Sequence, residues 1–352
     1  MQTKPLHEIN LPLKIVIGRR VVDLTGEYCN HLFSGNKMLV LTGPHVYGIA
    51  GKKVIESLED AGLLTHYVLV KGSTLRDVEA VREVIREVKP SALIAVGGGK
   101  VIDVAKYSSF LEDLPFVSVP TSASHDGIAS PVASIKDEKR RGSFFTRPPA
   151  LVIADVAIIS NAPQRLIASG CGDVIAKLTA VRDAKLARLI KGEYVGDYAL
   201  SLALLSARMV LSKAELIAKR SEEGIRTLIE ALISCGVAMA IAGSSRPCSG
   251  SEHLFSHALD IIAPTPALHG EQVGVGTIMM SYLHGIKWLK VRNFLKKVGA
   301  PTNAKELGID DHYIVKALTI AHKIRRRYTI LGESGLTWRA AEELARTTEV
   351  IS

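Results

Sequence analysis

The chain has 352 residues, of which 47% are hydrophobic and 22% charged, the composition of an ordinary core-forming protein with room for two domains. Its formal net charge is +9, but the excess is spread out without a basic tail, so we expect no nucleic-acid binding and at most the attraction of a small anion. Four isolated cysteines without a C-x-x-C pair favour reduced thiols and a cytoplasmic location over a disulfide framework.

The first part of the chain alternates short β-branched runs with helical patterns. Because strands that alternate with helices form parallel sheets, we predict a doubly wound, Rossmann-like α/β domain that binds a dinucleotide over residues 1–160. A hairpin with a charged tip is expected over residues 134–145. The expected strands are Lys14–Ile17, Met38–Leu41, Tyr67–Val70, Leu93–Val96, Phe116–Val119 and Val152–Ile153, with helices Val46–Ala61, Leu75–Val88 and Val101–Phe110 between them.

Helical periodicity dominates after residue 160, and no strand pattern returns. We therefore predict a second, all-helical domain over residues 161–352. The stretch 228–242 is the most apolar, but it contains Glu230 and is too short for a bilayer, and residues 1–11 lack a signal-peptide pattern, so we expect no integral membrane segment. The expected helices are Asp173–Leu189, Leu200–Arg220, Ile225–Ala242, Ser251–Ile262 and Glu271–Trp288.

A glycine run, Gly97-Gly98-Gly99, separates a predicted strand from a predicted helix; we call it the cofactor turn. It lets backbone approach a phosphate, and the helix start offers free N–H groups, although a tight turn without a ligand is the alternative. The hydroxyls of Pro120-Thr121-Ser122 after the next strand either bond a nucleotide or cap their turn. No acidic residue follows Leu41 to hold ribose hydroxyls, so we expect NADP to be tolerated as well as NAD.

One carboxylate and several histidines are candidate ligands of a metal site. His253 and His257 are four residues apart on a predicted helix and share one face, while Asp173 and His269 lie in other segments. Two histidines and one carboxylate suit zinc with an open position and non-haem iron alike. The plainer interpretations are structural histidines, and a helix-terminal Asp173 in a surface pair with Lys177.

Two further carboxylates flank these motifs. Asp126, after His125, either binds a substrate hydroxyl or is an ordinary turn aspartate, and Glu271 either orients His269 or is a first-turn helix carboxylate. A metal set beside a cofactor turn indicates a metal-assisted dehydrogenase, whereas an inactive nucleotide-binding scaffold is the non-enzymatic alternative.

Several stretches, taken together, resemble one known family. They are GGGKVIDVAK from Gly97, PTSASHDG from Pro120, GCGD from Gly170, SEHLFSHALD from Ser251 and LHGEQVG from Leu268. They look like the archaeal sn-glycerol-1-phosphate dehydrogenases, within the superfamily of glycerol dehydrogenase, iron-containing alcohol dehydrogenases and dehydroquinate synthase. The resemblance runs over nearly the whole chain; the cofactor turn marks only the superfamily, and the second and fourth stretches are more specific. Cys171 stands where we would expect an aromatic residue.

The resemblance implies an oxidoreductase that reversibly reduces dihydroxyacetone phosphate to sn-glycerol 1-phosphate with NADH or NADPH, for archaeal phospholipid biosynthesis. It implies one Zn²⁺ per subunit, held by Asp173, His253 and His269. Iron-containing relatives usually add a histidine, and His257 stands where it could serve, so Fe²⁺ is the second choice. The expected partners are the phosphate-ester substrate and further copies in a homo-oligomer. The alternatives are a glycerol or polyol dehydrogenase acting on an unphosphorylated substrate, and a dehydroquinate-synthase-like enzyme without net NADH turnover.

Carried over residue by residue, the resemblance also places the ligand contacts. Substrate contacts fall on Asp126, Asp173 and His257, with Asp126 orienting the substrate and either His257 or metal-bound water supplying the proton. The implied cofactor contacts are Gly97, Gly98, Gly99, Lys100, Val101, Val119, Pro120, Thr121, Ser122 and Ser130. The substrate phosphate needs a cationic partner, and the unranked candidates are Lys100, Lys177, Arg140 and Arg141.

Overall fold

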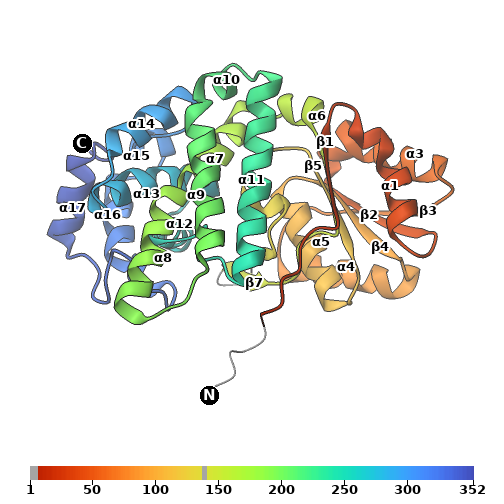
Figure 1. The fold of residues 1–352 in the computed structure, drawn as a ribbon, viewed down its shortest axis with the longest axis horizontal. Coiled ribbons are helices and arrows are strands. Elements are labelled where there is room, and N and C mark those ends of the chain that lie inside the picture. Colours follow the sequence, from red (N-terminus) through yellow and green to blue (C-terminus); the bar gives the residue numbers. More distant parts are fainter. Residues whose placement is uncertain (1–6, 137–140) are drawn as a thin grey trace.

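The computed structural model describes residues 7–136 and 141–352. Six parallel strands form one sheet in the order β1-β8-β5-β4-β2-β3 (Figure 1). The strands are β1 (Lys14–Gly18), β2 (Lys37–Thr42), β3 (Leu64–Leu69), β4 (Ala92–Gly97), β5 (Phe116–Pro120) and β8 (Leu151–Asp155). All six predicted strands are present. Only β3 is displaced, starting at Leu64 rather than Tyr67, because this largely exposed edge strand lacks the continuous apolar run of the central strands.

Helices cover both faces of the sheet, which confirms the predicted doubly wound arrangement. Side chains alternate along β2, so Met38 and Val40 pack with α1 (Thr25–Leu32) and α3 (Lys52–Asp60). Leu39 and Leu41 point to the opposite face, where α4 (Leu75–Val88) and α5 (Gly99–Leu111) lie. The apolar core on that second face continues without interruption into the helical half of the chain.

The first helical connection differs from its prediction. A single helix was expected over Val46–Ala61, but the chain forms α2 (Pro44–Val46), a π-helical stretch η2 (Tyr47–Gly51) and then α3. Gly48 and Gly51 fall within the π-helical stretch, and glycine is a weak α-helix former, which is consistent with the irregular start. A short 3₁₀ turn, η1 (Val21–Leu24), precedes α1.

The predicted hairpin is present as the antiparallel pair β6 (Val132–Lys136) and β7 (Arg141–Phe145). The tip, with Arg140, lies outside the described residues. A 3₁₀ turn, η3 (Asp126–Ile128), comes before the hairpin, and α6 (Val156–Ser160) ends where the domain boundary was predicted.

The rest of the chain is helical, in the part coloured green to blue in Figure 1. The predicted helices Ile225–Ala242 and Ser251–Ile262 keep nearly their predicted ranges. The predicted Glu271–Trp288 helix instead begins at His269 and ends at Leu283, and the predicted Leu200–Arg220 helix divides into α9 and α10. The elements are α7 (Gln164–Ile175), α8 (Lys177–Lys191), α9 (Asp197–Ser212), α10 (Ala214–Ala218), α11 (Glu222–Ala242), α12 (Ser251–Ile262), α13 (His269–Leu283), α14 (Trp288–Lys297), α15 (Ala304–Leu307), α16 (Asp311–Ile320), η4 (Ala321–Lys323) and α17 (Trp338–Thr347).

The predicted helix Asp173–Leu189 is wrong in its start. Asp173 lies in the last turn of α7, and α8 begins four residues later. The predicted start directly follows Gly170-Cys171-Gly172, but both glycines lie inside α7 for packing reasons. A Cβ on Gly170 would stand 1.9 Å from the carbonyl oxygen of Ala123, and one on Gly172 would stand 2.1 Å from that of Gly270. These glycines therefore allow backbone-to-backbone contact and do not mark an end.

Helix α11 is long and apolar enough to cross a membrane by length and composition alone. In the fold it packs along α9, beside which it stands in Figure 1, and its leucine and isoleucine side chains contribute to the main core. Helix α11 is therefore a core helix of this fold.

Candidate active site

The predicted motifs meet in one cavity of about 310 Å³. Its wall includes the cofactor turn and the segment after β5 from the α/β half, and α12 and the start of α13 from the helical half. The first two segments follow the carboxyl ends of β4 and β5, the edge at which open parallel sheets bind ligands. The cavity is thus the natural place for a cofactor and a small substrate to meet.

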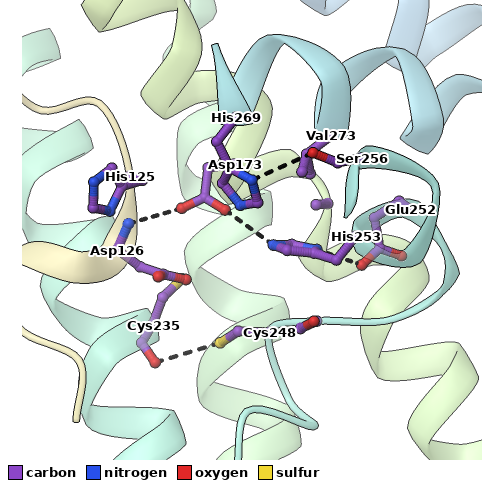
Figure 2. Close-up of polar contacts among 12 residues, drawn as sticks. His125, Asp126, Asp173, Cys235, Cys248, Glu252, His253, Ser256, His269 and Val273 are labelled. Carbon is purple, nitrogen blue, oxygen red and sulfur yellow. Dashed lines mark hydrogen bonds and ion pairs between the residues drawn. The ribbon is translucent and has the colours of Figure 1, made fainter. Parts of the chain in front are cut away.

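Three side chains from three helices converge in this cavity; we call Asp173, His253 and His269 the metal triad. One ligand atom from each lies within 4.8 Å of the other two, and His253 Nε2 is 3.4 Å from Asp173 Oδ1. Figure 2 shows the three groups pointing toward one another. An oxygen and two imidazole nitrogens at this spacing fit a divalent cation with coordination positions left for substrate. The arrangement brings together all three ligands that the resemblance implied.

Glu252 fixes the ring of His253, a role that the sequence analysis missed. Its Oε1 is 2.8 Å from His253 Nδ1 and accepts the Gly250 N–H at 2.6 Å, while Oε2 accepts the Thr179 hydroxyl at 2.7 Å. Burial acts to raise the pKa of Glu252, but these hydrogen bonds outweigh it and the pKa is lowered. A charged carboxylate here keeps the proton on Nδ1 and presents Nε2 to the metal position. Its position directly before His253 was the only available signal.

Ser256, not Glu271, contacts His269. The Ser256 hydroxyl is 3.3 Å from His269 Nδ1 and accepts a hydrogen bond from Gln272 Nε2 at 3.0 Å. Glu271 instead binds Arg165 through both oxygens, at 2.6 and 2.7 Å, and caps its own helix. The alternative of a first-turn carboxylate is therefore the correct one. Burial lowers the pKa of His269 well below its usual value, which favours a neutral ring able to bind metal.

The ammonium group of Lys177 links Asp126 and Asp173. Its Nζ donates to Asp126 Oδ2 at 2.9 Å, to Asp173 Oδ1 at 2.9 Å and to the Asp173 carbonyl at 2.8 Å. The side chain is fully buried, so the predicted surface pair is in fact an internal one. An ammonium has three N–H donors and all are used, which removes Lys177 from the phosphate candidates.

The charges around Lys177 hold both carboxylates in place. Burial acts to raise the pKa of Asp173, but Lys177 and the neighbouring histidines outweigh it and keep the pKa well below its usual value. The backbone N–H of Asp126 also donates to Asp173 Oδ2 at 2.8 Å, which Figure 2 marks. Asp126 lines the cavity and can therefore face a substrate while Lys177 fixes its other side.

His257 lines the cavity but is not one of the clustered metal ligands. Its ring stacks on that of His269 with the centroids 5.7 Å apart, and its Nε2 accepts a hydrogen bond from Arg325 Nη2 at 3.1 Å. Burial lowers the pKa of His257 to about 4. The ring is accordingly neutral, with its proton on Nδ1 toward Asp260.

The cofactor turn is held tightly between β4 and the helix that follows. Gly97 ends β4, its carbonyl accepts the Thr121 N–H at 3.1 Å, and Gly98 precedes the first residue of α5. A Cβ on Gly99 would stand 2.0 Å from His125 Nε2, so this residue has to be glycine for the imidazole to lie over the turn. The sequence analysis quoted His125 without giving it this role.

The other predicted cofactor positions surround the same turn. Gly98, Gly99, Lys100, Ser122 and Ser130 line the cavity. The side chains of Val101 and Val119 are buried in the core, so a contact from either is through its backbone. Pro120 pairs with Gly97 across the two strands, and Thr121 follows it. Every predicted cofactor residue therefore lies at the carboxyl ends of β4 and β5 or in the loop after β5.

The chain is similar over most of its length to several known proteins. The family model of iron-containing alcohol dehydrogenases matches residues 16–163. Two proteins named glycerol-1-phosphate dehydrogenase (NAD(P)+), from Thermococcus sibiricus and Pyrococcus furiosus, are each 53% identical over 347 residues, covering 98% of this chain and 99% and 100% of theirs. The crystal structure of glycerol dehydrogenase from Schizosaccharomyces pombe has the same fold, with a TM-score of 0.81 at 22% identity over 98% of this chain and 91% of that one. The chain therefore belongs to the glycerol-1-phosphate dehydrogenase family, among the iron-containing alcohol dehydrogenases.

Proposed function

We propose that this protein catalyses the reversible, NAD(P)H-dependent reduction of dihydroxyacetone phosphate to sn-glycerol 1-phosphate. The observation that carries the proposal is the convergence of the metal triad and the cofactor turn on one cavity. Relatives that match almost the full chain carry the name of this activity. We further propose a cytoplasmic homo-oligomer that supplies the glycerol backbone of archaeal phospholipids.

We assign Zn²⁺ to the metal triad. Asp173, His253 and His269 would hold it, and Glu252 supports the assignment because carboxylate-bound histidines are typical of zinc sites. The additional histidine that would favour Fe²⁺ is His257, whose Nε2 faces Arg325 instead of the triad. When bound, the cation supplies Lewis acidity at the substrate oxygen and the nicotinamide supplies the hydride.

The chain's own residues orient the substrate. Asp126 pairs with Lys177 and can accept a hydrogen bond from a substrate hydroxyl, while its backbone N–H donates to the carboxylate of Asp173. His257, stacked on His269, is a side chain we assign to substrate contact; its predicted role as proton donor does not fit, because its Nε2 accepts from Arg325 and its Nδ1 faces Asp260. The Gly98–Gly99 backbone and the start of α5 would hold the cofactor pyrophosphate.

The test is oxidation of NADH and of NADPH with dihydroxyacetone phosphate and, separately, with dihydroxyacetone. Zinc-loaded enzyme and an EDTA-stripped control are compared, and product chirality is determined. Metal-dependent turnover that strongly prefers the phosphate ester, with sn-glycerol 1-phosphate as product, supports the proposal. Preference for the unphosphorylated ketone would make the protein a polyol dehydrogenase, and absence of net NADH oxidation would favour a dehydroquinate-synthase-like reaction.

A further inference from the structure

One cation in the cavity wall has no place in the chemistry described above. Arg325 follows η4 and lines the cavity next to the metal triad. Its Nη2 donates to Ser143 Oγ at 2.6 Å and to His257 Nε2 at 3.1 Å. A guanidinium has five N–H donors, and Nε and Nη1 contact no acceptor among the described residues. In contrast to Lys177, Arg325 thus retains donors for a ligand.

Arg325 also lacks a counter-charge. Within the described ranges, no carboxylate lies within 4 Å of the guanidinium of Arg325 or of Arg327, and the partners of both are neutral. Burial lowers the pKa of Arg325, and it lowers that of Arg327 to about 10. A third guanidinium nearby, Arg246, is neutralised by Glu193. Burying a cation without an anion costs free energy of folding. This indicates that an anionic ligand binds beside Arg325 and Arg327, in a part of the cavity wall that we call the corner.

Hydroxyl groups around these arginines add the remaining donors. Ser143, Ser245 and Ser249 line the cavity from the hairpin and from the segment between α11 and α12. Arg327 donates to the Ser245 hydroxyl at 2.9 Å and to the Ser249 carbonyl at 2.5 Å, so it holds that segment in place. A fork of N–H groups with neighbouring hydroxyls is the usual protein setting for a phosphate.

We infer that Arg325, assisted by the hydroxyls of Ser143 and Ser245, binds the phosphate group of the substrate. The inference rests on the proposed function, and it assigns the preference for a phosphorylated substrate to Arg325. His257 touches both Arg325 and His269, so the corner lies one side chain away from the metal triad. In the substrate, the phosphorus is only three bonds from the carbon that receives the hydride. The phosphate group must therefore also bind close to the metal triad. Lys100 lies instead at the cofactor turn, on the first turn of α5.

The experiment compares Arg325→Met and Arg325→Lys with Arg326→Met, a control that removes the same charge from an exposed neighbour. For each protein, kcat/KM is measured with dihydroxyacetone phosphate and with dihydroxyacetone, and inorganic phosphate is tested as a competitive inhibitor. Loss of charge-assisted hydrogen bonds predicts a roughly 10- to 100-fold fall in the ratio of the two kcat/KM values for Arg325→Met, mainly through KM. Arg325→Lys should recover part of this ratio, and phosphate should inhibit Arg325→Met more weakly.

An unchanged ratio in Arg325→Met would overturn the inference, because equal losses on both ketones would mean that Arg325 acts only by positioning His257. An equal effect of Arg326→Met would overturn it too, since net charge alone would then explain the result. If Arg325→Met does not fold, the ratio and the phosphate inhibition of Arg325→Lys decide in the same way. Failure of the proposed function is a separate outcome, because it would appear as a low ratio in the unaltered protein.

Discussion

The carboxylate behind His253 offers the sharpest test of how the metal site is built. Glu252→Gln keeps the shape of the side chain, and its carbonyl oxygen can still accept from the Gly250 N–H and His253 Nδ1. The amide nitrogen then faces Thr179, whose hydroxyl can turn toward the Ala176 carbonyl, 2.9 Å away. The substitution therefore removes the negative charge with little change in packing.

The expected cost appears in metal affinity. Partners of this kind are worth about 10- to 100-fold in metal binding, or roughly 1.4–2.7 kcal/mol, because the carboxylate raises the basicity of the bound imidazole. The assay is competition for Zn²⁺ against a chelator of known affinity at neutral pH. The matched control is Glu271→Gln, another buried carboxylate near the triad, which binds Arg165 instead of a triad histidine.

Two results would refute this reasoning. Zinc affinity of Glu252→Gln equal to that of the unaltered protein would show that His253 does not need the carboxylate. An equal loss in Glu271→Gln would show that any buried charge near the site matters, regardless of which residue it contacts.

Three further predictions address the cofactor turn, the buried Lys177 and the ion pair of Glu193 with Arg246. Gly99→Ala puts a Cβ against His125, so NADH binding should weaken about tenfold or more in a fluorescence titration; an unchanged affinity would mean that the imidazole turns away freely. Lys177→Met leaves the buried carboxylate of Asp173 and the half-buried one of Asp126 without their cation and should lower the free energy of unfolding of the metal-free protein by roughly 3–5 kcal/mol in chemical denaturation. The hydrogen bond from Arg246 lowers the pKa of Glu193 in the folded protein, so this ion pair should stabilise the fold fully above about pH 4.5 and lose that contribution as the pH falls through the lowered pKa. Glu193→Gln should therefore flatten this part of the curve of unfolding free energy against pH. A curve of unchanged slope would argue against the pairing.

The central strands were predictable because a strand that is buried on both faces of its sheet consists of a continuous run of apolar residues. Runs such as Leu93–Val96 lie in the middle of the sheet, where every residue is buried, whereas the exposed edge strand β3 lacks such a run and was misplaced. The break between α7 and α8 was not predictable by periodicity. Glycines commonly mark helix ends, and nothing local shows that Gly170 and Gly172 serve close contacts with distant segments.

The metal ligands were identified through a resemblance, whereas the residues that support them depended on the fold. Glu252, Ser256 and Lys177 have ordinary sequence surroundings, and their roles come from which helices lie next to each other. The run of three arginines at 325–327 gives no local pattern that assigns a role to any one of them. The fold separates Arg325, which lines the cavity, and Arg327, which binds Ser245 and Ser249 of the cavity wall, from the exposed Arg326.

The two interior glycines of α7 have a mechanical consequence. Gly170 rests on the carbonyl of Ala123, in the loop after β5, and Gly172 rests on that of Gly270, next to a metal ligand. These contacts join main chain to main chain, so no side chain between them can stretch or repack. The helix that carries Asp173 therefore packs by its backbone against both the loop after β5 and the start of α13, so the positions of Asp126, Asp173 and His269 depend on one another without any intervening side chain.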